Sequence, residues 1–178
     1  MSALLAASGQ LTRSAGRRVE DFVDLRSVSF GSPAAIVTSM GLIIGLDAAT
    51  ATKAAVVGSL LIIGIADNLT DSLSVHIYQE AEKLAHRRAF RTTVANYFAR
   101  LITTASFVLI FLLLPGAAAV LGCALWGFLL LSALSFVLAK ARRVSPLAEI
   151  YKHAGIAVVV IGISKLLGFW IQGLTGLA

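Results

Sequence analysis

The shortage of charged residues is the feature that most constrains what this chain can fold into. Only 13% of its 178 residues are charged and 58% are hydrophobic, whereas a water-soluble domain has about a quarter of its residues charged. Such a chain has too little polar surface to cover itself in water, so we expect an integral membrane protein in contact with the lipid bilayer. The single cysteine, Cys123, excludes an internal disulfide and any multi-cysteine metal site.

The order of apolar and polar stretches predicts an all-α membrane protein with five transmembrane helices. A spanning helix needs roughly 20 apolar residues, and Pro33 suits the first turn of the first one. Pro115-Gly116 is a stop signal between the third and fourth spans. The expected spans are about 33–47, 54–78, 96–114, a fourth that follows almost at once and ends near 139, and 154–171.

Basic residues indicate the orientation of these spans. The net charge is +6, but most Lys and Arg residues flank apolar segments, and basic loops on alternate sides of successive spans are typical of the cytoplasmic face. We therefore expect the N-terminus in the cytoplasm, the C-terminus outside, and no nucleic-acid partner. The three basic clusters are Arg13, Arg17, Arg18 and Arg26; Lys83, Arg87, Arg88 and Arg91; and Lys140, Arg142, Arg143 and Lys152.

Two regions follow from this organisation. Residues 1–30 are expected to be a cytoplasmic tail, and Val19, Phe22 and Val23 recur there at a spacing that fits a short amphipathic helix on the membrane surface. Residues 31–178 are expected to form the five-helix membrane domain. Within its first span, Gly41 and Gly45 form a GxxxG pair, which favours close helix packing, with a dimer axis as one option.

Polar residues are concentrated in the second expected span. Four of them recur at spacings of i, i+4, i+7 and i+11, which places them on one helix sector about 60° wide. A charged side chain at mid-bilayer costs at least about 2.5–3.5 kcal/mol, so this polar side must meet protein or water and is a candidate functional site. The four residues are Asp67, Asp71, Ser74 and Tyr78, and Leu69, Leu73 and Ile77 lie on the opposite side.

Oxygen-rich positions of this kind suit hard or borderline divalent cations. A structural interpretation of the same stripe is an interhelical hydrogen-bonded seam, in which Asp67 or Asp71 is protonated or pairs with Lys165 of the last span. His76 is either a ligand near the cytoplasmic end or a satisfied interfacial histidine. The candidate metal ligands are Asp71, Asp67, Asn68, His76 and Glu80.

Three segments resemble the vacuolar iron transporter family. DLRSVSFGSPAAIVTSMGLIIGL resembles that family's approach to its first span, and ADNLTDSLSVHIYQEAE resembles its second span. The last hairpin, linked by SPLAEIYKHAGIAVVVIG, is similar as well, so the resemblance covers nearly all of residues 25–175. The chain looks like a short form of the family, because the long glutamate-rich cytoplasmic helices are reduced to residues 79–95.

The resemblance implies a homodimer that exports ferrous iron and manganese from the cytoplasm, in exchange for protons. The path would lie between the first and second spans of two subunits. Asp71 matches the second-span aspartate of the family, whereas Ala34 and Val75 stand where the family has an aspartate and a methionine. Asp67, Asn68 and His76 would then form a relocated metal site.

We therefore expect a divalent metal transporter, with the metal ion as substrate and no cofactor, in a prokaryotic inner membrane. The alternative from another class is a non-transporting membrane protein that keeps the fold as an interaction or assembly scaffold. An enzyme is not expected, because no nucleophile, base and orienting group occur at compatible depth.

Overall fold

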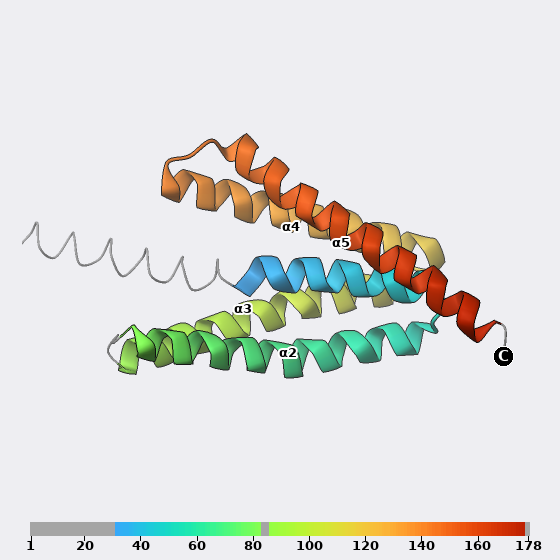
Figure 1. Cartoon of the computed structure of the whole chain (residues 1–178), viewed down its shortest axis with the longest axis horizontal. Helices are drawn as coiled ribbons and strands as arrows, with labels where there is room; N and C mark the ends of the chain where they lie inside the picture. Colours follow the sequence, from blue (N-terminus) through green and yellow to red (C-terminus); the bar gives the residue numbers. More distant parts are fainter. Residues whose placement is uncertain (1–30, 83–85, 177–178) are drawn as a thin grey trace, which may run out of the picture.

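The computed structural model describes residues 31–82 and 86–176, and these residues form an all-helical structure (Figure 1). Each of the five helices contains a segment long and apolar enough to cross a membrane. The all-α class is thus confirmed, while the surface helix expected within residues 1–30 lies outside the described residues. The helices are Gly31–Ala48, α2 (Lys53–Ala81), α3 (His86–Leu113), α4 (Gly116–Arg142) and α5 (Pro146–Thr175).

Local sequence sets the ends of these helices. The side-chain oxygen of Thr52 accepts a hydrogen bond of 3.2 Å from a backbone N–H in the first turn of α2, as an N-cap residue does. Pro115 lacks a backbone N–H and interrupts the helical hydrogen bonding between α3 and α4. Arg143 ends α4 in the left-handed conformation, and Pro146 occupies the first turn of α5. Short turns therefore connect neighbouring helices as antiparallel hairpins.

The third helix is longer than the sequence predicts. Hydropathy places its start near Asn96, whereas α3 begins at His86. The hydrophobic pattern marks where apolar residues begin, but the backbone is already helical through the basic residues Arg87 and Arg91. Arginine is a good helix former, so charged turns continue α3 beyond its apolar segment. Most of residues 79–95 are therefore helical.

The helix Gly31–Ala48 lies between two hairpins, one formed by α2 and α3 and the other by α4 and α5 (Figure 1). Its Ile36, Met40 and Ile43 are nearly inaccessible. They join Leu60 of α2 and Phe107 of α3 in one hydrophobic core. The first helix is therefore the central element around which the hairpins pack.

Small residues let the first helix approach α5 closely. A Cβ on Gly41 would lie 2.9 Å from Ser164 Oγ, and one on Gly45 would lie 3.0 Å from the Ser164 carbonyl oxygen. A Cβ on Gly168 would clash with the Gly45 carbonyl oxygen. The GxxxG pair is thus used inside one chain, where it allows close packing against α5.

Large apolar side chains cover the outside of the bundle. Leu69, Leu73 and Ile77, expected opposite the polar stripe of α2, are all more than half exposed. Exposed apolar side chains recur on α3, α4 and α5 as well, a surface suited to lipid contact. Cys123 is a small core residue, with its thiol 3.7 Å from the Phe107 carbonyl oxygen.

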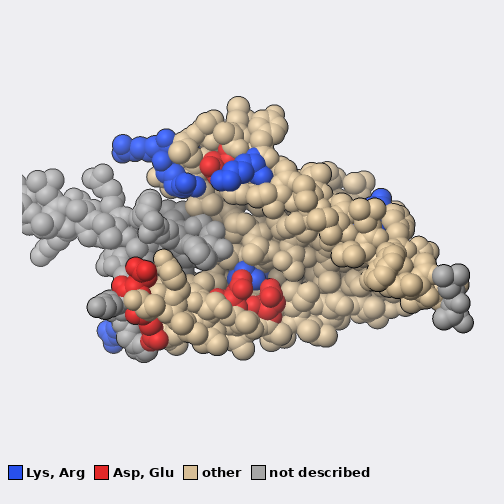
Figure 2. Space-filling view, viewed as in Figure 1, with Lys and Arg blue, Asp and Glu red and all other residues tan. Residues whose placement is uncertain are grey.

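Charges are distributed unevenly along the bundle. Figure 2 shows most of them near the end where the α2–α3 and α4–α5 turns lie, with one small patch of acidic and basic atoms midway along the face and a few basic atoms nearer the opposite end. This midway patch is the candidate functional site.

Candidate functional site

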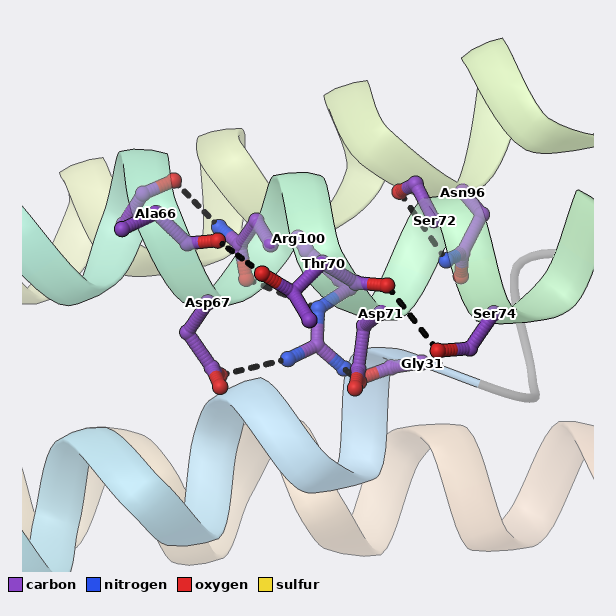
Figure 3. Close-up of polar contacts among 11 residues, drawn as sticks. Gly31, Ala66, Asp67, Thr70, Asp71, Ser72, Ser74, Asn96 and Arg100 are labelled. Carbon is purple, nitrogen blue, oxygen red and sulfur yellow. Dashed lines mark hydrogen bonds and ion pairs between the residues drawn. The ribbon is translucent and has the colours of Figure 1, made fainter.

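Arg100 is the centre of a charged cluster that joins α2 to α3 (Figure 3). Its side chain is 1% exposed. Arg100 lies near the middle of α3 and Asp67 at the middle of α2, about 20 Å from either helix end at a rise of about 1.5 Å per residue. In a bilayer crossed by these helices, the cluster lies within the spanning segments, where charged groups are costly.

The guanidinium of Arg100 is fully engaged by oxygen atoms. Nη2 pairs with Asp67 Oδ2 at 3.0 Å, and Nη1 pairs with Asp71 Oδ2 at 2.5 Å. Nε donates to Asn68 Oδ1 at 2.7 Å, and Nη1 donates to the Gly31 carbonyl oxygen at 2.9 Å. The planar fork of arginine donors suits such a set of acceptors. One side chain thus ties α3 to α2 and to the start of the first helix.

The two uncharged partners of Arg100 are fixed by their own surroundings. Asn68 is 1% exposed, and its Nδ2 donates to the Gly64 carbonyl oxygen at 2.6 Å, which turns Oδ1 toward Arg100. A Cβ on Gly31 would lie 2.7 Å from Arg100 Cδ. Glycine is therefore required where the first helix brings its carbonyl to the guanidinium.

Asp67 and Asp71 are far more accessible than the arginine between them. Their side chains are 47% and 46% exposed, and Figure 3 draws both pointing from α2 toward the side of the Gly31–Ala48 helix. Each meets Arg100 through Oδ2, and neither Oδ1 makes a hydrogen bond with the described residues. The cluster presents open carboxylate oxygens in front of a buried cation.

A polar seam extends the cluster between α2 and α3. Asn96 Nδ2 donates to Ser72 Oγ at 3.4 Å, and both residues are at most 2% exposed. Asn96 Oδ1 is buried without a hydrogen-bond partner among residues 31–82 and 86–176. It lies beside Gly31, because a Cβ there would clash with this oxygen. The Asn96 carbonyl is thus an unused acceptor next to the backbone that holds Arg100.

The structure brings together some of the predicted site residues and separates others. Asp67, Asn68 and Asp71 surround one guanidinium, whereas His76 and Glu80 form a separate pair further along α2 at 3.4 Å. His76 Nδ1 is also 3.3 Å from Thr93 Oγ1 of α3. Within the described part of the chain, no three His, Cys, Asp or Glu side chains are placed to hold one metal ion. Metal binding by these residues stays a prediction.

Two other members of the predicted stripe take no part in the cluster. The Ser74 hydroxyl donates to the Thr70 carbonyl oxygen at 3.0 Å, which satisfies it within α2, and Tyr78 is 61% exposed. The most buried sector of α2 is the neighbouring one, with Gly64, Asn68 and Ser72. The stripe is therefore the accessible border of the polar seam.

The alternative pairing of an aspartate with Lys165 is wrong. The Lys165 amine lies on the exposed side of α5, 5.8 Å from the centroid of the Phe169 ring. The aspartates instead pair with Arg100, which is presented by the helix packed directly against α2. A side chain on α3, which packs against α2 in the same hairpin, lies closer to the aspartates than a side chain on α5.

Arg100 is the residue that sequence reasoning missed, although the sequence holds a signal for it. It is the single charged residue within 96–114, the expected third span. Asn96, Arg100 and Thr104 recur at i, i+4 and i+8, and all three are buried. This spacing puts them on one face of a helix, just as the aspartates share one face of α2. Two polar faces in consecutive spans point to a common seam.

Comparisons with known proteins add no relatives: no family model, curated protein or solved structure matches this chain. The resemblance to the vacuolar iron transporter family therefore depends on the sequence segments quoted above.

Proposed function

We propose that this protein is a membrane transporter for small cations, and that its path passes Asp67 and Asp71. The observation that carries the proposal is the exposure of both carboxylates, close to half in each case, midway along helices that are long enough to span a bilayer. A carboxylate in contact with hydrocarbon is strongly disfavoured, so intramembrane carboxylates usually face a water-filled cavity or protein. Such positions typically mark ion pathways.

The charge of the cluster supports a cationic rather than an anionic substrate. Two carboxylates surround one guanidinium, which leaves one net negative charge when all three groups are ionised. The oxygens that are free of Arg100 are on the accessible side, and carboxylate oxygens are preferred ligands of hard cations. The resemblance to vacuolar iron transporters makes ferrous iron and manganese the divalent metals to test.

Orientation and direction are part of the same proposal. The basic side chains near the α2–α3 and α4–α5 turns include Arg87, Arg91, Lys140, Arg142 and Arg143, and basic residues favour the cytoplasmic side. We place that end in the cytoplasm, the C-terminus outside, and the protein in a prokaryotic inner membrane. Export from the cytoplasm, coupled to proton entry, is the direction that the resemblance implies.

We also propose that the transporter is a homodimer. In the single chain, the accessible edge of α2 carries Asp67, Asp71 and Tyr78 on its surface. A second copy placed against the first helix and α2 would separate the carboxylates from lipid and enclose a path between two subunits. The mass of the protein in detergent, measured by light scattering, would be that of two chains.

A non-transporting scaffold is the second candidate, and one observation favours it. Arg100 and Asn96 connect α3 to α2, and Arg100 also contacts Gly31. Such a buried polar network specifies helix packing without any substrate. In that case the carboxylates serve only as counter-charges for Arg100.

Cation flux into sealed proteoliposomes tests the proposal. Purified protein would be exposed to ferrous iron, manganese, sodium and potassium in turn, with and without an imposed pH gradient, beside protein-free liposomes. We expect uptake of at least one cation above the protein-free rate. Absence of flux for every cation, from protein that is folded and correctly inserted, would favour the scaffold. Flux that does not respond to the pH gradient would argue against proton coupling.

A further inference from the structure

We propose that Arg100 sets the charge of the cation that the cluster accepts, and that the preferred cation is singly charged, such as sodium. This inference rests on the proposed cation transport, and it refines the substrate class. It follows from where the guanidinium is held, which oxygens remain open and how many charges the cluster contains.

Arg100 is anchored independently of the two carboxylates. Asn68 Oδ1 accepts from Nε at 2.7 Å and the Gly31 carbonyl oxygen accepts from Nη1 at 2.9 Å, and the side chain is 1% exposed. A cation that reaches the aspartates from the accessible side does not compete for these two acceptors. The guanidinium therefore stays in place and its positive charge remains part of the site.

The accessible face offers oxygens without a full complement of contacts. The Oδ1 atoms of Asp67 and Asp71 make no hydrogen bonds with the described residues, and both side chains are about half exposed. Asn96 Oδ1 also lacks a hydrogen-bond partner in the described ranges, but it is buried beside Gly31 and is not on this face. A buried acceptor left without a donor is costly, and this one lies next to the Gly31 backbone that holds Arg100.

Charge balance then selects the valence. The two carboxylates and the guanidinium sum to one negative charge, so a singly charged cation makes the site neutral. A divalent cation would leave an excess positive charge beside Arg100. Repulsion between like charges is stronger beside a buried guanidinium than in bulk water, because the protein screens it less. Among the described residues, Asp67 and Asp71 form ion pairs with Arg100 alone.

A charge series of variants separates this electrostatic role from a structural one. Arg100→Gln raises the net negative charge of the cluster to two, and Asp67→Asn lowers it to zero. The double variant Asp67→Asn with Arg100→Gln lacks the guanidinium but has the same net charge as the native cluster. Arg142→Gln, at an exposed position outside the cluster, is the matched control for loss of a basic residue.

The measurement is the cation-induced rise in unfolding temperature of the purified protein in detergent, with sodium, potassium and manganese titrated at fixed pH. Cation flux is measured on the same proteins in liposomes. Binding and transport are thereby measured separately. Binding of a cation without flux would overturn the proposed transport function, but it would leave the role of Arg100 in selecting the charge of the cation intact.

We expect sodium to stabilise the native protein and Arg142→Gln more than manganese does. Arg100→Gln should favour manganese over sodium by about tenfold or more relative to the native protein. The double variant should return to the native preference, and Asp67→Asn should bind both cations weakly. Should the variants that lack Arg100 not fold, the native preference and Asp67→Asn, which keeps the guanidinium, still decide. A native preference for manganese, or a double variant that prefers it, would overturn the inference.

Discussion

Arg100 and Asp71 form an ion pair in which the cation is buried and the anion is not: the arginine side chain is 1% exposed and the aspartate side chain 46%. Two helices of one hairpin thus hold a charge pair midway along their length, with its negative side accessible. This asymmetry distinguishes the cluster from a fully buried salt bridge, in which a cation in solution could reach neither partner.

Loss of the arginine should destabilise the protein strongly. Arg100→Met removes the contacts to Asp67, Asp71, Asn68 and Gly31 and leaves two carboxylates without a counter-charge. Breaking a buried charged network from one side costs about 3–5 kcal/mol. Thermal or denaturant unfolding in detergent should detect this loss.

The control for that variant is Arg142→Met. Its ion pair with Glu149 is long, at 3.9 Å, and the Arg142 side chain is 59% exposed, so its loss should cost at most about 1 kcal/mol. Equal stability of the two variants would show that Arg100 does not hold the helices together.

Substitution of the lysine in the last helix should have little effect. Lys165 lies on the exposed side of α5 beside Phe169, away from the aspartates, so Lys165→Met should change the free energy of unfolding by less than about 0.5 kcal/mol. The same unfolding measurement checks this. A loss comparable to that of Arg100→Met would restore the pairing of Lys165 with an aspartate.

Two glycines of α5 should respond oppositely to the same change. A Cβ on Gly168 would clash with the Gly45 carbonyl oxygen and lie 2.7 Å from Ala48 Cβ, whereas a Cβ on Gly162 would meet no atom within 4 Å. Gly168→Ala should therefore cost about 1–3 kcal/mol through overpacking. Gly162→Ala should stabilise the helix by about 0.5–1 kcal/mol. Unfolding transitions of both variants would test this, and equal shifts would contradict the close approach of the first helix to α5.

Cysteine labelling should locate the two ends of the bundle. In a Cys123→Ala background, Thr50→Cys in the turn before α2 should react with a membrane-impermeant maleimide added to intact cells. Arg143→Cys at the end of α4 should react only after the membrane is opened, because basic turns favour the cytoplasm. The opposite pattern would reverse the proposed orientation and the direction of export.

Hydropathy predicts the fold well because the bilayer imposes helix length and apolar surface directly on the sequence. The spans end within a few residues of the observed helices, except that α3 starts at His86 instead of near Asn96 and α5 starts at Pro146 instead of near Ala154. Polar helix ends explain both exceptions, since helical backbone outside hydrocarbon needs no apolar side chains.

The site could be predicted only in part. Periodicity places Asp67 and Asp71 on one face of α2, because both lie on a single helix of known pitch. It cannot say which helix faces them: the alternative structural interpretation named Lys165 as their partner, and Arg100 was missed. That choice depends on the tertiary neighbours of α2, which a one-helix pattern does not contain. The buried position of Asn68, and its bond to Arg100, likewise required the arrangement of α3.

The most direct test of the central claim is cation flux through Asp71→Asn in proteoliposomes. The matched control is Asp47→Asn, because Asp47 is an exposed carboxylate near the end of the first helix that lies away from Gly31. Both variants would first be shown to be folded and inserted. Transport past the cluster predicts that Asp71→Asn loses the cation flux of the native protein while Asp47→Asn retains it. Native flux through folded Asp71→Asn would contradict the account.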